Sequence, residues 1–99
     1  MVKVVISKSP RADKRFVAVF RKDDGTKIKT THFGLKNPKK GTFIDHQDTK
    51  LKENYLKRHK KNENWKDPFS AGSLSRHILW NKSTLNSSIA DYKSRFKLD

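Results

Sequence analysis

One turn signal in the first third of the chain constrains the fold more than any other feature. Residues 22–26, Lys-Asp-Asp-Gly-Thr, have the composition of a type I turn followed by a left-handed glycine, which closes three-residue β-hairpins. The flanking segments, Arg15 to Lys22 and Thr26 to Phe33, are rich in strand formers, and the first alternates Phe16, Ala18 and Phe20 with valines. The chain is therefore predicted to contain an antiparallel hairpin.

The turn also predicts a register for the two strands. With Lys22 opposite Thr26, the paired residues on one face are Phe20 with Ile28, Ala18 with Thr30 and Phe16 with His32. On the opposite face Arg21 lies across from Lys27, and like charges that face each other on a ladder repel. We expect that face to stay solvated or to meet anions. Val2 to Ser7 is predicted to form a third strand and Thr42 to Asp45 a short fourth one.

The second half of the chain has helical periodicity. A helix is predicted from Asp48, a suitable N-cap, and its apolar side would carry Leu51, Tyr55, Leu56 and His59. A second helix is predicted from Ser70 or Ser73 to about Trp80, with apolar side chains most of the way round, as in a helix that is central to a core or docked on a partner. A third is predicted after Ser83. Its apolar positions are Leu85, Ile89, Tyr92 and Phe96.

These elements predict one α+β domain over residues 1–99. A small antiparallel sheet of three or four strands, built on the β-hairpin, would be followed by about three helices. The segment from about residue 34 to 41 contains Asn37-Pro38 and three lysines with little apolar content, so it is predicted to be a mobile basic loop. No apolar run approaches the roughly 20 residues that span a bilayer, so no membrane insertion and an intracellular, soluble protein are expected.

Charge provides the main functional signal. The 99 residues carry 24 Lys and Arg against 10 Asp and Glu, a formal net charge of +14. Such an excess opposes compaction unless anions lie nearby, and it indicates a polyanionic or acidic partner. A solvated basic surface without a partner is the alternative. The candidate binding residues lie on the predicted hairpin and on one stripe of the first predicted helix: Arg15, Arg21, Lys27, Lys29, Lys50, Lys57 and Lys61.

Catalysis is poorly supported by the sequence. The chain has no cysteine, so zinc fingers and thiol enzymes are excluded, and its four histidines show no metal-binding spacing. The enzyme class most compatible with a basic chain is a nuclease using His59, Asn62, Glu63 and His77, but no second cluster supports it. The four glycines are isolated, so no phosphate-binding loop is present. We expect no enzymatic activity, no metal and no cofactor.

Two tryptophans are the informative apolar residues. Trp65 stands in a polar stretch, where its ring either pins the loop to the core or anchors a contact with another protein. Trp80 follows Leu79 at the end of the second predicted helix. Trp65, Leu79 and Trp80 are the candidate anchors of a protein interface.

Four segments resemble a family of short basic proteins encoded by large nucleocytoplasmic DNA viruses, including mimivirus-like and algal viruses. The segments are residues 14–20 (KRFVAVF), 29–34 (KTTHFG), 58–65 (RHKKNENW) and 71–80 (AGSLSRHILW). The resemblance carries no enzymatic activity or cofactor. It implies a viral origin and a place in the virion, with the host cytoplasm or nucleus as the site of assembly.

Resemblance and charge together favour a minor capsid component that bridges acidic surfaces of other virion proteins. The alternative is a sequence-independent nucleic-acid-binding protein that contacts the DNA phosphate backbone and helps to condense or package the genome. Both functions would use the same lysines.

Overall fold

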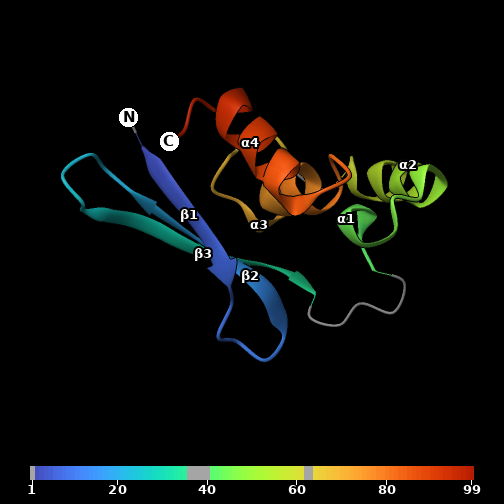
Figure 1. The fold of residues 1–99 in the computed structure, drawn as a ribbon, viewed down its shortest axis with the longest axis horizontal. Coiled ribbons are helices and arrows are strands. Elements are labelled where there is room, and N and C mark those ends of the chain that lie inside the picture. The colour runs from blue at the N-terminus through green and yellow to red at the C-terminus, as the bar shows by residue number, and fades with distance from the viewer. Residues whose placement is uncertain (1, 36–40, 62–63) are drawn as a thin grey trace.

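A computed structural model describes residues 2–35, 41–61 and 64–99 of the chain. Three strands form one antiparallel sheet in the order β1-β2-β3, and helical segments follow it (Figure 1). The strands are β1 (Lys3–Lys8), β2 (Lys14–Arg21) and β3 (Lys27–Leu35), and the helical segments are α1 (Phe43–His46), α2 (Thr49–His59), α3 (Ala71–Leu74), the π-helix η1 (Ser75–Leu79) and α4 (Leu85–Arg95). The α+β prediction is confirmed.

The β2–β3 hairpin has the predicted turn but not the predicted register. Lys22 N–H donates to the Thr26 carbonyl at 2.9 Å, and Gly25 adopts a φ of 89°, as a left-handed turn glycine requires. Arg21 pairs with Lys27, but a bulge follows, and beyond it Phe20 pairs with Lys29 and Phe16 with Phe33. The predicted pairings of Phe20, Ala18 and Phe16 were each wrong by one position, so that Ala18, for example, lies opposite Thr31 instead of Thr30.

The bulge changes which side chains face the core. The extra residue in β3 shifts the alternation of that strand by one position, because successive strand residues point to opposite faces. Phe33 is therefore 1% exposed in the core, whereas His32 lies on the other face, where its Nδ1 is 2.7 Å from Ser9 Oγ. The shift buries the apolar phenyl ring of Phe33 in place of the polar imidazole of His32.

The predicted fourth strand is wrong, because residues 42–46 form the start and body of α1. Thr42 and Asp45 make a capping box, in which Thr42 N–H and Oγ1 both donate to Asp45 Oδ2, at 2.7 and 2.8 Å. These bonds satisfy polar groups at the helix start that a strand would leave to a neighbour. Of the predicted mobile loop, Gly34 and Leu35 belong to β3, and residues 36–40 lie outside the described residues.

The predicted helices are present with altered ends. Asp48 caps α2, and its carboxylate accepts from the amides of Lys50 and Leu51. Ser70 caps α3, which continues directly into η1 as one helical segment. Thr84, and not the predicted Ser83, caps α4 by accepting from the Ser87 amide at 3.1 Å.

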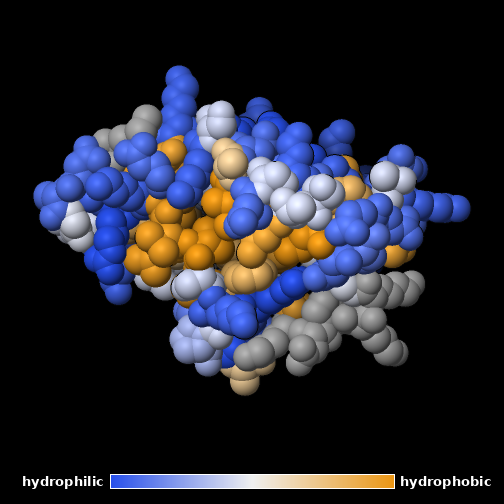
Figure 2. Space-filling view, viewed as in Figure 1, coloured by the Kyte–Doolittle hydropathy of each residue, from blue (hydrophilic) through white to orange (hydrophobic). Residues whose placement is uncertain are grey.

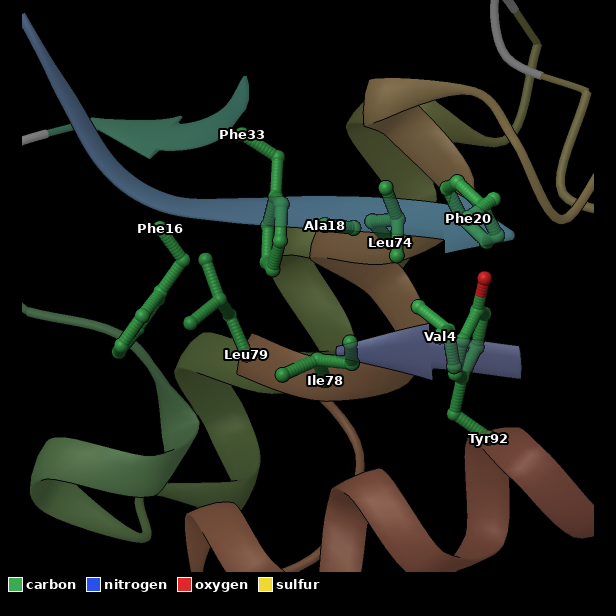
Figure 3. Close-up of a cluster of buried hydrophobic side chains, with 9 residues drawn as sticks. All are labelled: Val4, Phe16, Ala18, Phe20, Phe33, Leu74, Ile78, Leu79 and Tyr92. Atoms are coloured by element: carbon green, nitrogen blue, oxygen red, sulfur yellow. The ribbon is translucent and has the colours of Figure 1, made fainter. Parts of the chain in front are cut away.

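The core lies between the sheet and the segment formed by α3, η1 and α4 (Figure 3). Phe16, Ala18 and Phe20 point from β2 toward Leu74 and Ile78, which are fully buried. The all-round apolar character predicted for the second helix thus belongs to a helix central to the core. Tyr92 of α4 closes the core beside Val4, and its hydroxyl donates to the Pro68 carbonyl at 2.6 Å.

Candidate functional site: two basic surfaces

The first basic surface is at the turn end of the hairpin. The register places Lys3 of β1 and Lys27 of β3 on either side of Arg21, so three cations form one row across the sheet. All three side chains are exposed. We call Lys3, Arg21 and Lys27 the hairpin surface. Lys29 was predicted to belong with them, but the bulge pairs it with Phe20, whose ring faces the core, so Lys29 lies on the opposite face of the sheet from Arg21. The pairing of Arg21 with Lys27 was predicted, and the structure adds Lys3 to it.

Like charges in one cross-strand row are unfavourable by a few tenths of a kcal/mol to about 1 kcal/mol for each pair. Part of this repulsion is offset by the carboxylates of Asp23 and Asp24 in the adjoining turn. Asp24 is itself engaged, because its Oδ1 accepts from the Thr26 amide at 2.9 Å, and this hydrogen-bonding to Thr26 lowers the pKa of Asp24. A bound anion would relieve the repulsion along the row.

The second basic surface is on α2. Lys50 and Lys57 are two helical turns apart and therefore share a face, and Lys61 follows just after the helix ends. All three side chains are exposed, whereas Tyr55 of the same helix is buried. We call Lys50, Lys57 and Lys61 the helix surface, as the sequence predicted.

The two surfaces lie far apart. The β2–β3 turn and α2 are at opposite ends of the long axis of the molecule in Figure 1. The molecule measures 42 Å along that axis and 28 and 25 Å across it. The two surfaces therefore cannot form one continuous binding groove.

Arg15 does not belong to either surface. Its guanidinium donates to both carboxylate oxygens of Asp45, at 2.8 and 2.7 Å, and also contacts Thr42 Oγ1 at 3.3 Å. This guanidinium holds the pKa of Asp45 well below its usual range. Arg15 is therefore not a free surface cation, because its charge is engaged in an ion pair within the fold, and its contact with a polyanion stays a prediction.

Of the three predicted interface anchors, Leu79 is in the core. It is 1% exposed and packs with Phe16 and Phe33, so the prediction that it contacts a partner is wrong. The cause is the π-helical turn of η1, whose wider turn brings both Ile78 and Leu79 inward.

The two tryptophans are half-buried against their own chain. Trp80 stacks on Tyr55 of α2, with ring centroids 4.5 Å apart and planes 7° apart. The Arg76 guanidinium lies 5.6 Å from the centre of the Trp65 ring, and the Trp65 carbonyl accepts from Ser73 Oγ at 3.2 Å. These contacts fix the loop before α3 to the helical segment. A role of either indole in an interface stays a prediction.

The residues of the nuclease interpretation do not form a described cluster. His59 stacks on Tyr55 with ring centroids 4.3 Å apart, and His77 Nε2 lies 3.2 Å from the Trp65 carbonyl. Burial lowers the pKa of His77. Asn62 and Glu63 lie outside the described residues, and within the described ranges no group of three His, Asp or Glu side chains could hold a metal ion.

A hollow that the sequence did not indicate lies between β3, α2 and the α3–η1 segment. It measures about 410 Å³, and its walls include the rings of Phe33, Tyr55 and Trp80. Lys14 and His59 are among its polar lining residues. Its walls come from elements distant in sequence, so no local motif could have predicted it.

Fold and surfaces together define a small, strongly basic α+β protein. None of the described helices is long and apolar enough to cross a membrane. A family model described as a family of unknown function (DUF5754) matches residues 4–59, more than half of the chain, and the chain belongs to this family. The match runs from β1 to the end of α2. No curated protein and no solved structure matches the chain.

Proposed function

We propose that this protein is a non-enzymatic bridging protein that joins two acidic surfaces, one at each end of its long axis. The observation that carries this proposal is the separation of the hairpin surface from the helix surface (Figure 1). A protein that follows one polyanion needs a continuous basic track, whereas a bridging protein needs two separated ones. The 42 Å length sets the spacing between the two bridged surfaces.

We further propose that the bridged surfaces belong to capsid proteins of a large DNA virus, in which this protein is a minor component of the virion shell. The resemblance of four segments to short basic proteins of such viruses supports this part of the proposal. In a shell, the lysines would set the register between neighbours and suppress wrong contacts. The half-buried Trp65 and Trp80 would add apolar contact with a neighbour.

Bridging can be tested with two populations of beads, both coated with polyglutamate and carrying different dyes. The purified protein should join beads of both colours, and flow cytometry counts the mixed pairs. Two triple variants remove equal charge: Lys3→Gln, Arg21→Gln and Lys27→Gln on the hairpin surface, and Lys50→Gln, Lys57→Gln and Lys61→Gln on the helix surface. Each should still bind single beads and should lose most of the mixed pairs.

A third triple variant is the matched control. Lys66, Lys82 and Lys97 are exposed and belong to neither surface, so their replacement by Gln removes the same charge. This variant should bridge beads as the unaltered protein does. Equal loss of bridging in all three variants would show that net charge alone is responsible, and the proposal would fail.

Genome condensation is the alternative, because the same lysines can contact DNA phosphates. Fractionation of intact virions separates the two locations. The protein should remain with the emptied shell. Its departure with the nucleoprotein core would replace the shell proposal with the genome-binding alternative.

A further inference from the structure

Strand β1 is an edge of the sheet, and its hydrogen-bond directions are known from two contacts. The Val4 N–H donates to the Asp99 carbonyl at 2.9 Å, so the polar backbone groups of Val4 point away from β2. Ser9 N–H, five residues on, donates to the Arg15 carbonyl at 3.1 Å and so points toward the β2 side. Because backbone groups alternate along an antiparallel strand, those of Ile6 and Lys8 also point away from β2.

Asp99 covers only the first part of this edge. Asp99 accepts from Val4 and donates to the Val2 carbonyl at 2.9 Å, so it forms one rung beside β1. Among the described residues, no backbone group pairs with the Val4 carbonyl, with Ile6 or with Lys8 on the outer side of β1. An unpaired edge of this kind is a template for another strand.

An apolar strip borders the open part of the edge. Ile6 on β1 and Leu85 and Ile89 on α4 are partly buried side chains that pack against the core and leave part of their surface exposed. Figure 2 shows hydrophobic surface across the region between β1 and the helices, with hydrophilic surface around it. A strand added at the edge could place alternate side chains on this strip.

We propose that an extended, acidic segment of another protein binds here as a fourth strand, pairing with β1 from Val4 to Lys8. Asp99 gives the precedent for strand addition, because its backbone already pairs with the first part of the same edge. The net charge of +14 opposes a second copy of the chain and favours an acidic partner. The proposed strand uses neither the hairpin surface nor the helix surface, so it does not depend on the bridging proposal.

The probe is an end-blocked, fluorescein-labelled nine-residue peptide in which Glu alternates with Val and Thr. Fluorescence anisotropy measures its affinity, and amide hydrogen exchange locates it. On binding, the Ile6 and Lys8 amides should become protected. A peptide with Lys in place of Glu, and one of the same composition in shuffled order, should bind more weakly than the probe.

The discriminating variants are Lys8→Pro and Lys8→Gln. Both remove the charge of an exposed side chain, but only proline removes the outward N–H, and an edge strand tolerates proline where its N–H faces outward. Lys8→Pro should weaken peptide binding about tenfold, as expected for the loss of one backbone hydrogen bond and the disturbance of its neighbour, whereas Lys8→Gln should change it by less than about threefold. Equal loss of affinity in the two variants would show that the peptide responds only to the charge of Lys8 and not to its backbone N–H, and this would overturn the proposal.

Two further measurements keep the proposal testable. If Lys8→Pro fails to fold, the unaltered protein can be tested with a peptide that is N-methylated at alternate amides. N-methylation on the edge that pairs with β1 should abolish binding, and unchanged binding would overturn the proposal. Analytical ultracentrifugation without peptide tests whether a second copy of the chain occupies the edge of β1. A concentration-dependent dimer with protected Ile6 and Lys8 amides would replace the acidic partner with a second copy.

Discussion

Arg15 of β2 and Asp45 of α1, which are 30 residues apart in the sequence, form a bidentate ion pair. The two hydrogen bonds measure 2.8 and 2.7 Å, and the same carboxylate accepts from the Thr42 amide at 2.7 Å. One side chain thus caps α1 and ties it to the sheet. It also engages the charge of Arg15 within the fold.

The first prediction concerns Asp45→Asn. The guanidinium of Arg15 lowers the pKa of Asp45 in the folded state below the roughly 3.9 of an unfolded chain, so the ionised carboxylate stabilises the fold. This contribution is present above the unfolded pKa and is lost as the pH falls toward the folded pKa. The Arg15 and Asp45 side chains are 25% and 36% exposed, so solvent partly screens the ion pair, and we expect Asp45→Asn to lower the free energy of unfolding by about 1 kcal/mol at neutral pH.

Urea denaturation at a series of pH values checks this prediction. The gap between Asp45→Asn and the unaltered protein should be widest near neutral pH and should narrow steadily below about pH 4. Asp13→Asn is a control, because Asp13 also pairs with an arginine, Arg11, but both side chains are more than half exposed. A gap that is independent of pH would contradict the role assigned to the Asp45 charge.

The sequence predicted the hairpin and its turn because the signal is local. The register beyond the turn was not predictable in the same way, since the bulge is favoured by what it buries, Phe33 in place of His32. The same limit applies to α1. Thr42 and Asp45 have capping-box spacing, but the intervening Phe43 and Ile44 also suit a strand, and only the contact with Arg15 decides between the two.

The candidate surfaces were predictable in part for the same reason. Lysines two turns apart on one helix share a face whatever the tertiary structure, so Lys50 and Lys57 could be grouped from the sequence. Lys3 joins Arg21 only through the pairing of β1 with β2, which no local pattern specifies. The burial of Leu79 depends on the π-helical turn, and a regular helical period predicts a different direction for its side chain.

The second prediction concerns Tyr92→Phe. Tyr92 is fully buried and its hydroxyl donates to the Pro68 carbonyl at 2.6 Å, so the variant leaves that carbonyl without this donor. We expect the free energy of unfolding to fall by about 1–2 kcal/mol. Thermal or urea denaturation checks this value, and a change near zero would show that the bond contributes nothing net.

Alkaline titration gives a separate check on Tyr92. Burial is the main cause that raises the pKa of this phenol well above its usual range, so the folded protein keeps Tyr92 neutral while an unfolded chain begins to ionise near about pH 10. Its stabilising contribution is therefore complete below that pH and is lost as the pH rises further. The absorbance change of phenolate in the folded protein below about pH 10 should be the same in Tyr92→Phe and in the unaltered protein.

The third prediction concerns metal ions. Within the described part of the chain no three His, Asp or Glu side chains come together as metal ligands. We therefore expect that a chelator leaves the thermal denaturation of the purified protein and its binding to polyglutamate unchanged. A stoichiometric zinc signal by elemental analysis, combined with unfolding on chelation, would contradict this prediction.

The last prediction compares two glycines with similar backbone conformations. Gly25 and Gly34 have φ values of 89° and 80°, so alanine is strained by about 1–2 kcal/mol at either position. The surroundings differ. A Cβ at Gly25 would have no heavy atom within 4 Å, whereas one at Gly34 would lie 2.9 Å from Leu79 Cδ1 and 3.3 Å from Arg15 Cβ.

Leu79 cannot move aside without cost, because it is 1% exposed in a packed core. We expect Gly34→Ala to add an overpacking cost of about 1–3 kcal/mol to the backbone strain that it shares with Gly25→Ala. For a domain of this size, each kcal/mol lowers the melting temperature by about 4–8 °C, so Gly34→Ala should melt clearly below Gly25→Ala. Adding Leu79→Ala to Gly34→Ala should cost less than Leu79→Ala alone, since the new methyl group then has space, and strictly additive losses would contradict the contact.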